Sequence, residues 1–358
     1  MNRHHYGLIL AGGRGTRFWP LSRRRSSKQV LTVMGERSLI QGTVDRLAPV
    51  IPPERLWILT NHHLRDVIVR QLPEIPRRQV LAEPAQRNTA PAIGLAAQIL
   101  QSLDPDAVMG VFPADHVVNR ETAYRSVVRA AMKAAAAGHL TLVGIEPRWP
   151  ETGYGYVEFP QGTKPGGSAP LEVLRFHEKP ILAKAKRYLA AGNFYWNSGM
   201  FFWRTDVLLE QLRRHLPKTA TILAALPPFR SRLFADRLAK AFPLCDNISI
   251  DFAVLEKAGK VAGIAAGDFG WNDVGSWNAV YELMGRDDCG NVVANDSICL
   301  EAHDNFVDAR GKMVALLGVK DLIVVDTPDA LLVASRDRAQ QVGDIVKVLE
   351  KSKRNDLL

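Results

Sequence analysis

The chain has 358 residues, of which 47% are hydrophobic and 23% are charged, and its formal net charge at pH 7 is +9. This length allows roughly two domains of about 150 residues each, and the composition is ordinary for a soluble globular protein. No stretch reaches the ~20 apolar residues of a membrane span, and three cysteines without metal-ligand spacing predict no disulfide framework. We therefore expect a cytoplasmic protein.

The positive net charge is compatible with nucleic acid or with small polyanions as partners. The sequence contains no lysine-rich helix or tail and no aromatic residues interleaved with basic ones, which nucleic-acid-binding proteins usually show. The basic residues are scattered apart from Arg23–Arg25. Such a run is more often a solvated loop than a site, but beside a phosphate loop it could steer anions. We therefore expect small polyanions and no nucleic acid.

The first predicted strand is the apolar run Leu8–Leu10, which ends abruptly at a glycine-rich loop. Its glycines allow the backbone to approach a ligand with several N–H groups converging, which suits phosphate oxygens. Pro20 disfavours helix at Trp19, so the loop continues for several residues. We expect its basic side chains to surround a triphosphate. They are Arg14, Arg17, Arg23, Arg24, Arg25 and Lys28.

Two familiar phosphate loops do not fit this stretch. A Walker A loop needs lysine and then serine or threonine directly after its last glycine, whereas Thr16 and Arg17 follow Gly15. A dinucleotide-binding fingerprint needs a small residue at Phe18 and a helix that opens directly from the glycines. A glycine turn in a solvated basic loop remains an alternative on this stretch alone.

From Ser38 to Ile145, helices and buried strands alternate, which predicts an α/β fold with a largely parallel sheet. Thr89 followed by Pro91 predicts the N-cap and first turn of the third helix. The predicted helices are Ser38–Leu47, His63–Leu72, Thr89–Leu100 and Ala123–Ala137. The predicted strands are Leu56–Thr60, Gln79–Ala82, Ala107–Phe112 and Leu140–Ile145.

After Pro150, two apolar stretches flank a Gly/Pro-rich connection that predicts an exposed hairpin loop. The stretches are Tyr154–Phe159 and Leu171–His177. The elements predicted next are a helix at Ala183–Ala191, a strand at Gly199–Trp203, helices between Asp206 and Lys240, a short helix closing at Val254–Lys257 and a strand at Val261–Ala265.

Beyond about Gly285, short strands separated by Asp, Asn and Gly turns predict a small all-β unit, which divides the chain into domains 1–285 and 286–358. A final helix has one apolar face that needs a partner. We expect this tail to be structural, to make a subunit contact in a homodimer and to lie outside the active site. The apolar residues are Val342, Ile345, Val346 and Leu349. The strands are Asn291–Ala294, Ser297–Glu301, Asn305–Asp308, Met313–Leu317, Leu322–Asp326 and Ala330–Ala334.

Asp115 lies just past the carboxyl end of a buried strand, where open parallel sheets bind ligands. It could be a hydrogen-bonded turn residue, but a Mg²⁺ site usually takes one or two carboxylates with waters and phosphate oxygens. Asp273, between two tryptophans in WNDVGSW, is the natural second carboxylate. A glycosyltransferase of related fold would normally show Asp-x-Asp at the first position, where this chain has FPADH.

Several motifs in order, across about residues 6–335, resemble the sugar-1-phosphate nucleotidyltransferases, most nearly the mannose-1-phosphate guanylyltransferases. They are AGGRGTRFWPLS, SKQV, GERSLIQ, EPAQRNTAPAI, FPADH, ETGYGYVEF, FHEKP, WNSGMF, ISIDFAVLEK and WNDVGSW. The resemblance implies a Rossmann-like mixed, mainly parallel sheet flanked by helices, and a left-handed β-helix-like C-terminal domain. The chain departs from the family at Ser27 (usually Pro), Val30 (commonly Phe) and Phe252 (usually Tyr).

The resemblance also implies roles for individual residues. Arg17 and Lys28 would be catalytic by clamping the triphosphate, and Asp115 and Asp273 would hold Mg²⁺. Nucleotide-binding residues would be Ala11, Gly12, Gly13, Gly15, Thr16, Glu83, Asn88 and Thr89. Residues that bind the sugar phosphate would be Gly155, Glu178, Lys179 and Asn197, although Glu178-Lys179 alone would pass for a surface pair. Asp251 falls in a family motif but could equally be a helix N-cap.

These expectations combine into Mg²⁺-dependent transfer of GMP from GTP to mannose 1-phosphate, which yields GDP-mannose and pyrophosphate. The sugar phosphate oxygen would attack the α-phosphorus in line, and a phosphate dianion needs no Ser, Cys or His base. The alternatives are another sugar 1-phosphate or nucleotide, a dinucleotide-dependent oxidoreductase disfavoured by Phe18, and a nucleic-acid-binding protein. Because the chain ends at Leu358, we expect no phosphomannose isomerase activity.

Overall fold

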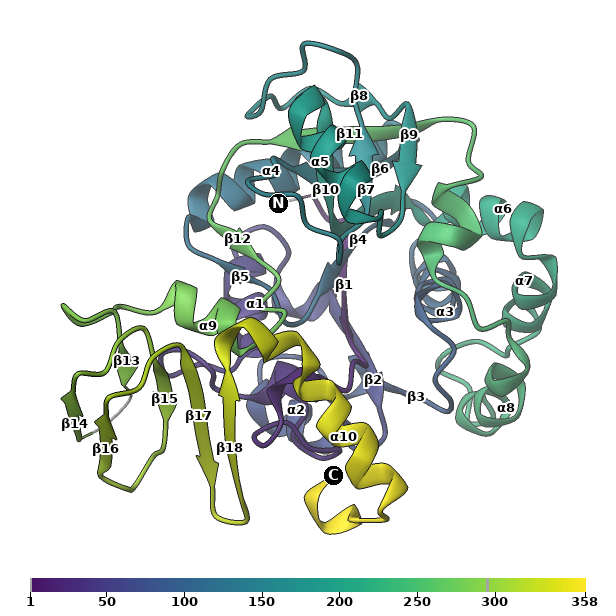
Figure 1. Ribbon diagram of the computed structural model, residues 1–358. Helices are drawn as coiled ribbons and strands as arrows, with labels where there is room; N and C mark the ends of the chain where they lie inside the picture. Colours follow the sequence, from purple (N-terminus) through teal and green to yellow (C-terminus); the bar gives the residue numbers. More distant parts are fainter. Residues whose placement is uncertain (1, 294–295) are drawn as a thin grey trace.

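A ten-stranded mixed sheet forms the centre of the protein (Figure 1). The computed structural model describes residues 2–293 and 296–358. The sheet strands are β1 His5–Ala11, β2 Leu56–Asn61, β3 Val80–Glu83, β4 Val108–Pro113, β6 Leu140–Ile145, β7 Tyr156–Glu158, β8 Leu171–Glu172, β9 Arg175–His177, β10 Phe194–Arg204 and β11 Val261–Ala266. The order is β3-β2-β1-β4-β10-β6-β11-β8, with β7 paired to β10 and β9 paired to β7.

Neighbouring strands at the β3 end of the sheet are parallel, as the alternation of strands and helices along the sequence predicted. Strands β3, β2, β1 and β4 run the same way, and β6 and β11 run parallel to each other. Strand β10 is antiparallel to both of its neighbours, β4 and β6. The predicted mixed, mainly parallel sheet is therefore confirmed.

Helices cover both faces of the sheet, which explains why β1 reads as a continuous apolar run. Leu8 of β1 packs in the cluster that contains α3 and α6, whereas the next residue, Ile9, packs in the cluster that contains α1, α2 and α4. The helices are α1 Leu39–Leu47, α2 Arg65–Gln71, α3 Thr89–Leu103, α4 Glu121–Ala136, α5 Leu182–Ala191, α6 Thr205–His215, α7 Pro217–Ala224, α8 Phe234–Ala241, α9 Trp277–Leu283 and α10 Val342–Lys351.

The N-terminus of α3 differs from the prediction. Its N-cap is Asn88, whose side chain accepts a hydrogen bond from the Thr89 N–H at 2.9 Å. Thr89 is already helical, and its hydroxyl accepts from the Ile250 N–H at 2.9 Å. This hydrogen bond connects α3 to the loop before a π-helix, Asp251–Leu255. Capping rules consider only residues close in sequence, so they could not predict a bond to Ile250.

The C-terminal β-rich domain contains a strand in each of the predicted stretches. These strands are β13 Val292–Val293, β14 Ser297–Leu300, β15 Phe306–Asp308, β16 Val314–Leu317, β17 Leu322–Thr327 and β18 Ala330–Ser335; the predicted end of the first, Ala294, lies outside the described residues. β13, β15 and β17 are parallel, as are β14 and β16, whereas β18 is antiparallel to β17. Buried Asn305 donates to the Asn291 side chain at 2.9 Å, so stacked turns share a polar ladder.

Most of the apolar face of α10 packs on the same chain, whereas Ile345 is 36% exposed, and the expected subunit contact stays a prediction. Val342 and Val346 are buried in one cluster with Phe18 and Trp19, at the end of the glycine-rich loop. Figure 1 shows α10 in yellow crossing the purple start of the chain. Among residues 2–293 and 296–358, no helix combines the length and apolar character needed to cross a bilayer.

Candidate active site

The glycine-rich loop and the Asp115 loop emerge at the same edge of the sheet. β1 and β4 are parallel neighbours, and Leu10 of β1 pairs with Pro113 of β4. Because both strands end at this register, the segments that follow them lie side by side. This places the two most informative sequence motifs at the carboxyl edge of a parallel sheet, where ligands bind.

Two features shape the glycine-rich loop. Gly15 has a φ of 59°, and a Cβ there would lie 2.5 Å from the Lys28 Cβ, so glycine permits a close approach of these segments. Buried Gln29 donates to the carbonyls of Ala11, at 2.7 Å, and Gly13, at 3.1 Å. The loop also contains a 3-10 turn, Thr16–Phe18, where we had predicted continuous loop.

Lys28 contacts both of the predicted metal-binding residues, Asp115 through its carboxylate and Asp273 through its backbone carbonyl. Its Nζ donates to Asp115 Oδ2 at 2.8 Å and to the Asp273 carbonyl oxygen at 2.7 Å. Lys28 is only 6% exposed. Lysine is almost never fully buried unless its charge is paired, and the two contacts above supply that pairing. Lys28 is therefore not one of several solvated cations, which was the competing interpretation of the basic loop.

A small ribbon brings the Asp115 and Asp273 motifs together. Strand β5, Val117–Val118, pairs antiparallel with β12, Trp271–Asn272. Asp273 follows directly, and Val274 after it has a φ of 47° although it is β-branched and buried. A positive φ is strained for a β-branched residue. Such a conformation persists only where the packing around the residue holds it in place. Two-residue strands give too little periodicity to be seen in a sequence.

Both carboxylates line a cavity of about 240 Å³. Its walls are Gly15, Thr16, Arg17, Phe18, Lys28, Asp115, His116, Asp273 and Gly275. Burial opposes ionisation of Asp115, but Lys28, through its charge and its hydrogen bond, and the other groups around this carboxyl together outweigh burial and lower its pKa. Two carboxylate oxygens facing a cavity of this size fit a Mg²⁺ ion, which keeps several waters and phosphate oxygens among its ligands.

His116 contributes a neutral ring between the cavities. Burial lowers its pKa to about 4. The Trp271 Nε1–H donates to His116 Nδ1 at 3.1 Å, so the ring proton is on Nε2. His116 therefore adds no charge near the carboxylates, and its Nε2–H is a donor.

A second, larger cavity of about 740 Å³ adjoins the first and shares His116 and Asp273 with it. Part of its lining is made by the predicted base-recognition residues Glu83, Asn88 and Thr89 together with Gly12 and Gly13. Another part is made by the predicted sugar-binding residues Gly155, Glu178 and Asn197. The structure thus places both groups of residues in the wall of one cavity.

Close packing shapes the wall of the larger cavity around the predicted sugar-binding residues. A Cβ on Gly155 would lie 2.6 Å from Glu178 Oε2, so glycine lets this carboxylate reach the cavity. The register of β10 shifts between Asn197 and Phe201, and such irregularities re-aim side chains beside active sites. Asn197 Nδ2 donates to Asp251 Oδ1 at 3.0 Å. Burial, and then the neighbouring Glu178, raise the pKa of Asp251 to about 6.

Some predicted residues do not reach the cavities. Ala11 is buried and its carbonyl already accepts from Gln29 and from Thr60, at 2.9 Å, so it does not line either cavity. The Lys179 side chain is 63% exposed and its Nζ pairs with Glu178 at 2.6 Å. Asp251 is not the alternative N-cap but the first residue of the π-helix, on the cavity wall.

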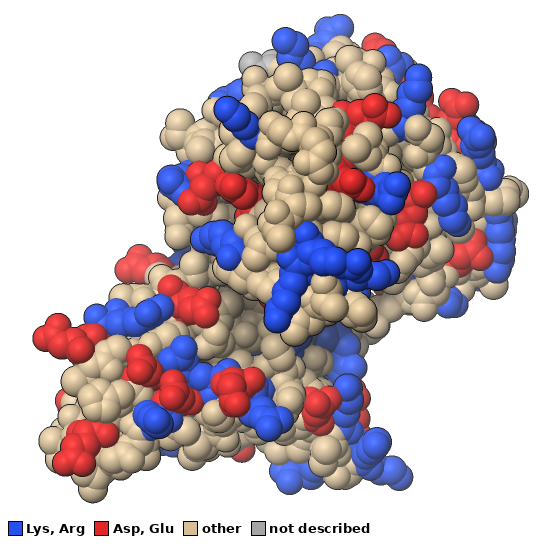
Figure 2. All heavy atoms as spheres, turned by 45° about the horizontal axis from the view of Figure 1, so that its top comes forward, with Lys and Arg blue, Asp and Glu red and all other residues tan. Residues whose placement is uncertain are grey.

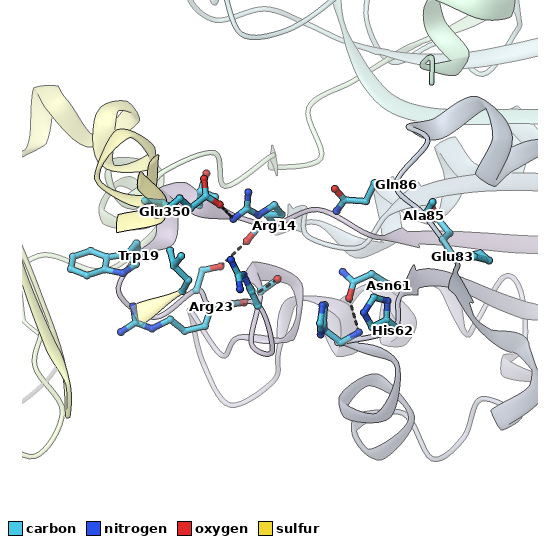
Figure 3. Close-up of a pocket in the computed structure, with 17 residues that line it drawn as sticks. Arg14, Trp19, Arg23, Asn61, His62, Glu83, Ala85, Gln86 and Glu350 are labelled. Carbon is cyan, nitrogen blue, oxygen red and sulfur yellow. Dashed lines mark hydrogen bonds and ion pairs between the residues drawn. The ribbon is translucent and has the colours of Figure 1, made fainter. Parts of the chain in front are cut away.

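Two other basic residues of the loop, Arg14 and Arg23, contact the C-terminal part of the chain. Arg14 pairs with Glu350 of α10 at 2.5 Å, and Arg23 donates to the Leu357 carbonyl and to Asp329. Figure 3 shows Arg14 pointing at Glu350, beside a separate cavity of about 360 Å³. Of the basic side chains of the loop, Arg17 and Lys28 line the small cavity, whereas Arg14, Arg23 and Arg24 line the separate one.

Sequence reasoning missed Tyr154 and gave no role to His116 and Gln29. Tyr154 Oη donates to Asp273 Oδ1 at 2.5 Å, and burial together with this carboxylate raises the pKa of the phenol. Both tyrosines of ETGYGY looked alike in sequence, and the fold alone separates them: Tyr156 donates to the Glu151 carbonyl. Buried Gln29 stands next to Lys28 in SKQV, so its position was the available signal.

Charge on the molecular surface is mixed. Figure 2 shows Lys and Arg side chains interspersed with Asp and Glu over most of the visible face, with several basic side chains adjacent near its centre. The positive charges that matter for the site are those next to its carboxylates. Buried Lys28 and the Arg17 Nη1, which donates to the Gly275 carbonyl at 2.9 Å, are both at the small cavity.

Comparison with known proteins gives the same picture. A family model described as nucleotidyl transferase matches residues 6–288, and one described as a MannoseP isomerase/GMP-like beta-helix domain matches residues 295–349. The chain is 40% identical over 361 residues to mannose-1-phosphate guanylyltransferase ManC of Salmonella typhimurium strain LT2, covering 97% of this chain and 73% of that protein. It is 38% identical over 362 residues to mannose-1-phosphate guanylyltransferase of Escherichia coli strain K12, covering 98% and 74%.

A solved structure agrees with this one over nearly the whole chain. A crystal structure from Thermus thermophilus, described as a mannose-1-phosphate geranyltransferase, has a TM-score of 0.85 and 34% identity, and covers 97% of this chain and 99% of that one. The fold thus defines a nucleotidyl transferase with a C-terminal β-helix-like domain. The chain belongs to the nucleotidyl transferase family, and within it to the mannose-1-phosphate guanylyltransferases.

Proposed function

We propose that the protein transfers GMP from GTP to α-D-mannose 1-phosphate, giving GDP-mannose and pyrophosphate. The observation that carries the mechanism is the buried Lys28 ammonium between Asp115 and Asp273, in a small cavity that opens beside a larger one. The small cavity suits the triphosphate and its Mg²⁺. The larger one accommodates guanosine beside Glu83 and the sugar phosphate beside Glu178.

Catalysis in this arrangement is positioning plus neutralisation of charge. Asp115 and Asp273 are the residues that would hold Mg²⁺, which when bound neutralises charge on the phosphate oxygens. Arg17 and Lys28 clamp the triphosphate and favour departure of pyrophosphate. The sugar phosphate oxygen attacks the α-phosphorus in line, and because it is already anionic no side chain has to remove a proton. Neutral His116 is a donor near the reacting phosphates.

Around the predicted sugar-binding residues, the polar groups fit hydroxyls. Glu178 accepts, and the Asn197 amide both donates and accepts, which is what discrimination between sugar epimers requires. Asn197 is fixed by its bond to Asp251. Lys179 would have to leave its pairing with Glu178 to reach the sugar phosphate, and its exposed side chain is free to do so.

The decisive test combines each of several nucleoside triphosphates with each of several hexose 1-phosphates. The rate is measured as release of pyrophosphate. GTP with mannose 1-phosphate should give the highest kcat/KM. A higher value with another pair would establish the second candidate, a nucleotidyltransferase for a different sugar or base. No pyrophosphate release with any pair would refute the proposed reaction.

Glu83 is the residue we propose to read guanine. A Cβ on Gly12 would lie 3.8 Å from Glu83 Oε1, so this carboxyl faces the glycine-rich loop in the wall of the larger cavity. An ionised carboxylate can accept from both N1–H and N2–H of guanine, whereas adenine offers an acceptor at N1. Paired hydrogen bonds of this kind are worth about 1–3 kcal/mol of base discrimination.

This role predicts a pH-dependent affinity. Burial raises the pKa of Glu83 to about 7, so its carboxyl is largely protonated at pH 6 and ionised at pH 8. The protonated form offers a donor where guanine needs an acceptor, so GTP should bind more tightly as the pH rises through 7. Glu83→Gln should weaken GTP binding roughly tenfold at pH 8 and should narrow the preference for GTP over ATP.

The measurement is calorimetric GTP affinity at pH 6, 7 and 8 for the wild type and for Glu83→Gln. Because the phosphates of GTP also titrate in this range, the informative quantity is the ratio of the two affinities, in which the phosphate contribution cancels. A ratio that does not change with pH would mean that Glu83 does not contact the base.

The remaining parts of the proposal concern context. We propose Mg²⁺ as the metal, a cytoplasmic location, and domains spanning residues 1–285 and 286–358. We also propose a homodimer, since α10 is already packed internally but apolar side chains on the C-terminal strands, such as Ile298, Leu317 and Leu331, are at least half exposed. Light scattering should give twice the chain mass, and a monomer at micromolar concentration would contradict the homodimer.

A further inference from the structure

The C-terminal domain supplies a hydrogen bond to one of the two cations of the small cavity. Arg17 Nη1 donates to the Gly275 carbonyl at 2.9 Å and to Gln340 Oε1 at 2.8 Å. Gly275 belongs to the Asp273 motif, whereas Gln340 lies far beyond every motif that the sequence suggested. A residue from the supposedly structural tail therefore contacts the phosphate-binding machinery.

We infer that Gln340 is a positioning residue for Arg17, and thereby for the triphosphate; this rests on the proposed nucleotidyl transfer. A Cβ on Gly275 would lie 3.4 Å from Arg17 Nη1 and 2.9 Å from Asp273 Oδ2, so the guanidinium and the metal carboxylate flank one backbone position. Holding Arg17 there keeps its charge beside the place where pyrophosphate leaves.

The backbone of Gln340 is held by a short helix with several contacts to the rest of the protein, although the Gln340 side chain is exposed. It lies in the 3-10 helix Arg336–Gln341. Arg336 at the start of this helix donates to Asn278 at 3.0 Å and to the Asp304 carbonyl at 2.9 Å, and its guanidinium lies 3.6 Å from the Tyr281 ring centroid. Ala339, next to Gln340, is 2% exposed. This helix therefore fixes where the amide can point.

The beginning of α10 also approaches the loop closely. A Cβ on Gly343 would lie 3.3 Å from Thr16 Oγ1 and 3.8 Å from Arg17 Cγ. Glycine at this position leaves room for the helix to lie against the loop, which brings Gln340 within reach of Arg17. The same helix contributes Glu350 to Arg14, so the C-terminal domain holds the loop at more than one point.

The chemistry of an amide suits this place. Its oxygen accepts from the guanidinium without adding the negative charge that a carboxylate would bring close to a triphosphate. Gln340 thus orients Arg17 and leaves the positive charge available to the ligand. Glu350, which carries charge, pairs instead with Arg14, and Arg14 does not line the small cavity.

The test is Gln340→Met, which keeps the length of the side chain and removes its acceptor. We expect kcat/KM for GTP to fall about tenfold, with KM for mannose 1-phosphate and the unfolding temperature unchanged. Gln341→Met is the matched control, because Gln341 is the next residue of the same helix and accepts from Arg338 instead. That control should stay within twofold of the wild type.

A double-mutant cycle separates positioning from general damage. In the Arg17→Ala background, Gln340→Met should have no further effect, because there is nothing left to orient. An equal loss in both backgrounds would overturn the inference, as would Gln340→Met activity within twofold of the wild type.

Binding of Mg²⁺-pyrophosphate, measured by calorimetry, keeps the test independent of the proposed substrates. Gln340→Met should bind it about tenfold more weakly than the wild type and Gln341→Met. Unchanged or tighter binding would overturn the inference, and tighter binding would show that Gln340 competes with phosphate for Arg17. If the wild type binds pyrophosphate yet turns over no substrate pair, the proposed function fails while the inference is still decided.

Discussion

Replacing Asp115 or Asp273 by asparagine is expected to lower kcat by at least about a thousandfold, which corresponds to roughly 4 kcal/mol of transition-state stabilisation. Both carboxylates line the cavity of about 240 Å³, and Mg²⁺ sites of this kind use one or two protein carboxylates. Loss of one negative charge removes half of the protein's contribution to such a site.

Asparagine should leave the local structure intact. Its side-chain oxygen can still accept from Lys28 at position 115 and from Tyr154 at position 273, which are the contacts present now. Circular dichroism and the unfolding temperature should therefore stay close to those of the wild type. Mn²⁺ binding, titrated by electron paramagnetic resonance, should weaken in both variants.

Asp66→Asn is the matched control for these two changes. The Asp66 side chain is 69% exposed, on α2, and its nearest cation is Arg65 at 3.6 Å. This variant should keep wild-type turnover and Mn²⁺ binding. Near-wild-type rates at limiting Mg²⁺ for Asp115→Asn or Asp273→Asn would remove that residue from the metal site.

Lys28→Ala is expected to lower kcat by roughly 10²–10³, which is about 3–4 kcal/mol by analogy with the loss of an oxyanion-hole donor. The lysine is 6% exposed and its ammonium contacts both carboxylate motifs, so its charge acts where water screens it poorly. Lys28→Arg should recover little, because a planar guanidinium places its charge differently and does not fit a space built for a compact ammonium.

The measurement is kcat with saturating GTP and mannose 1-phosphate at low and moderate salt. A buried charge predicts a loss that salt does not change, whereas a surface charge predicts a loss of a few-fold that salt masks. Lys133→Ala, an exposed lysine on α4, is the surface control. A salt-sensitive loss below about tenfold for Lys28→Ala would exclude the catalytic role.

Much of the fold could be predicted from local pattern. Continuous apolar runs such as Leu8–Leu10 indicated strands buried on both faces, and the alternation with helices indicated a mainly parallel sheet. An aspartate directly after such a strand had to lie at the ligand-binding edge, which is where Asp115 lies. Periodicity and chain order determine these features because they are local in the sequence.

The arrangement within the site was decided by the tertiary structure. Pairing of β5 with β12, each only two residues long, sets Asp273 beside Asp115 and leaves Lys28 buried between them. Local sequence pattern does not distinguish Arg14, Arg17 and Lys28 within the basic loop. In the structure, Arg14 pairs with Glu350 of α10, outside the small cavity, whereas Arg17 lies at that cavity and donates to Gln340. Contacts between residues hundreds of positions apart leave no local pattern, so the sequence determined which residues could act and the fold determined which of them meet.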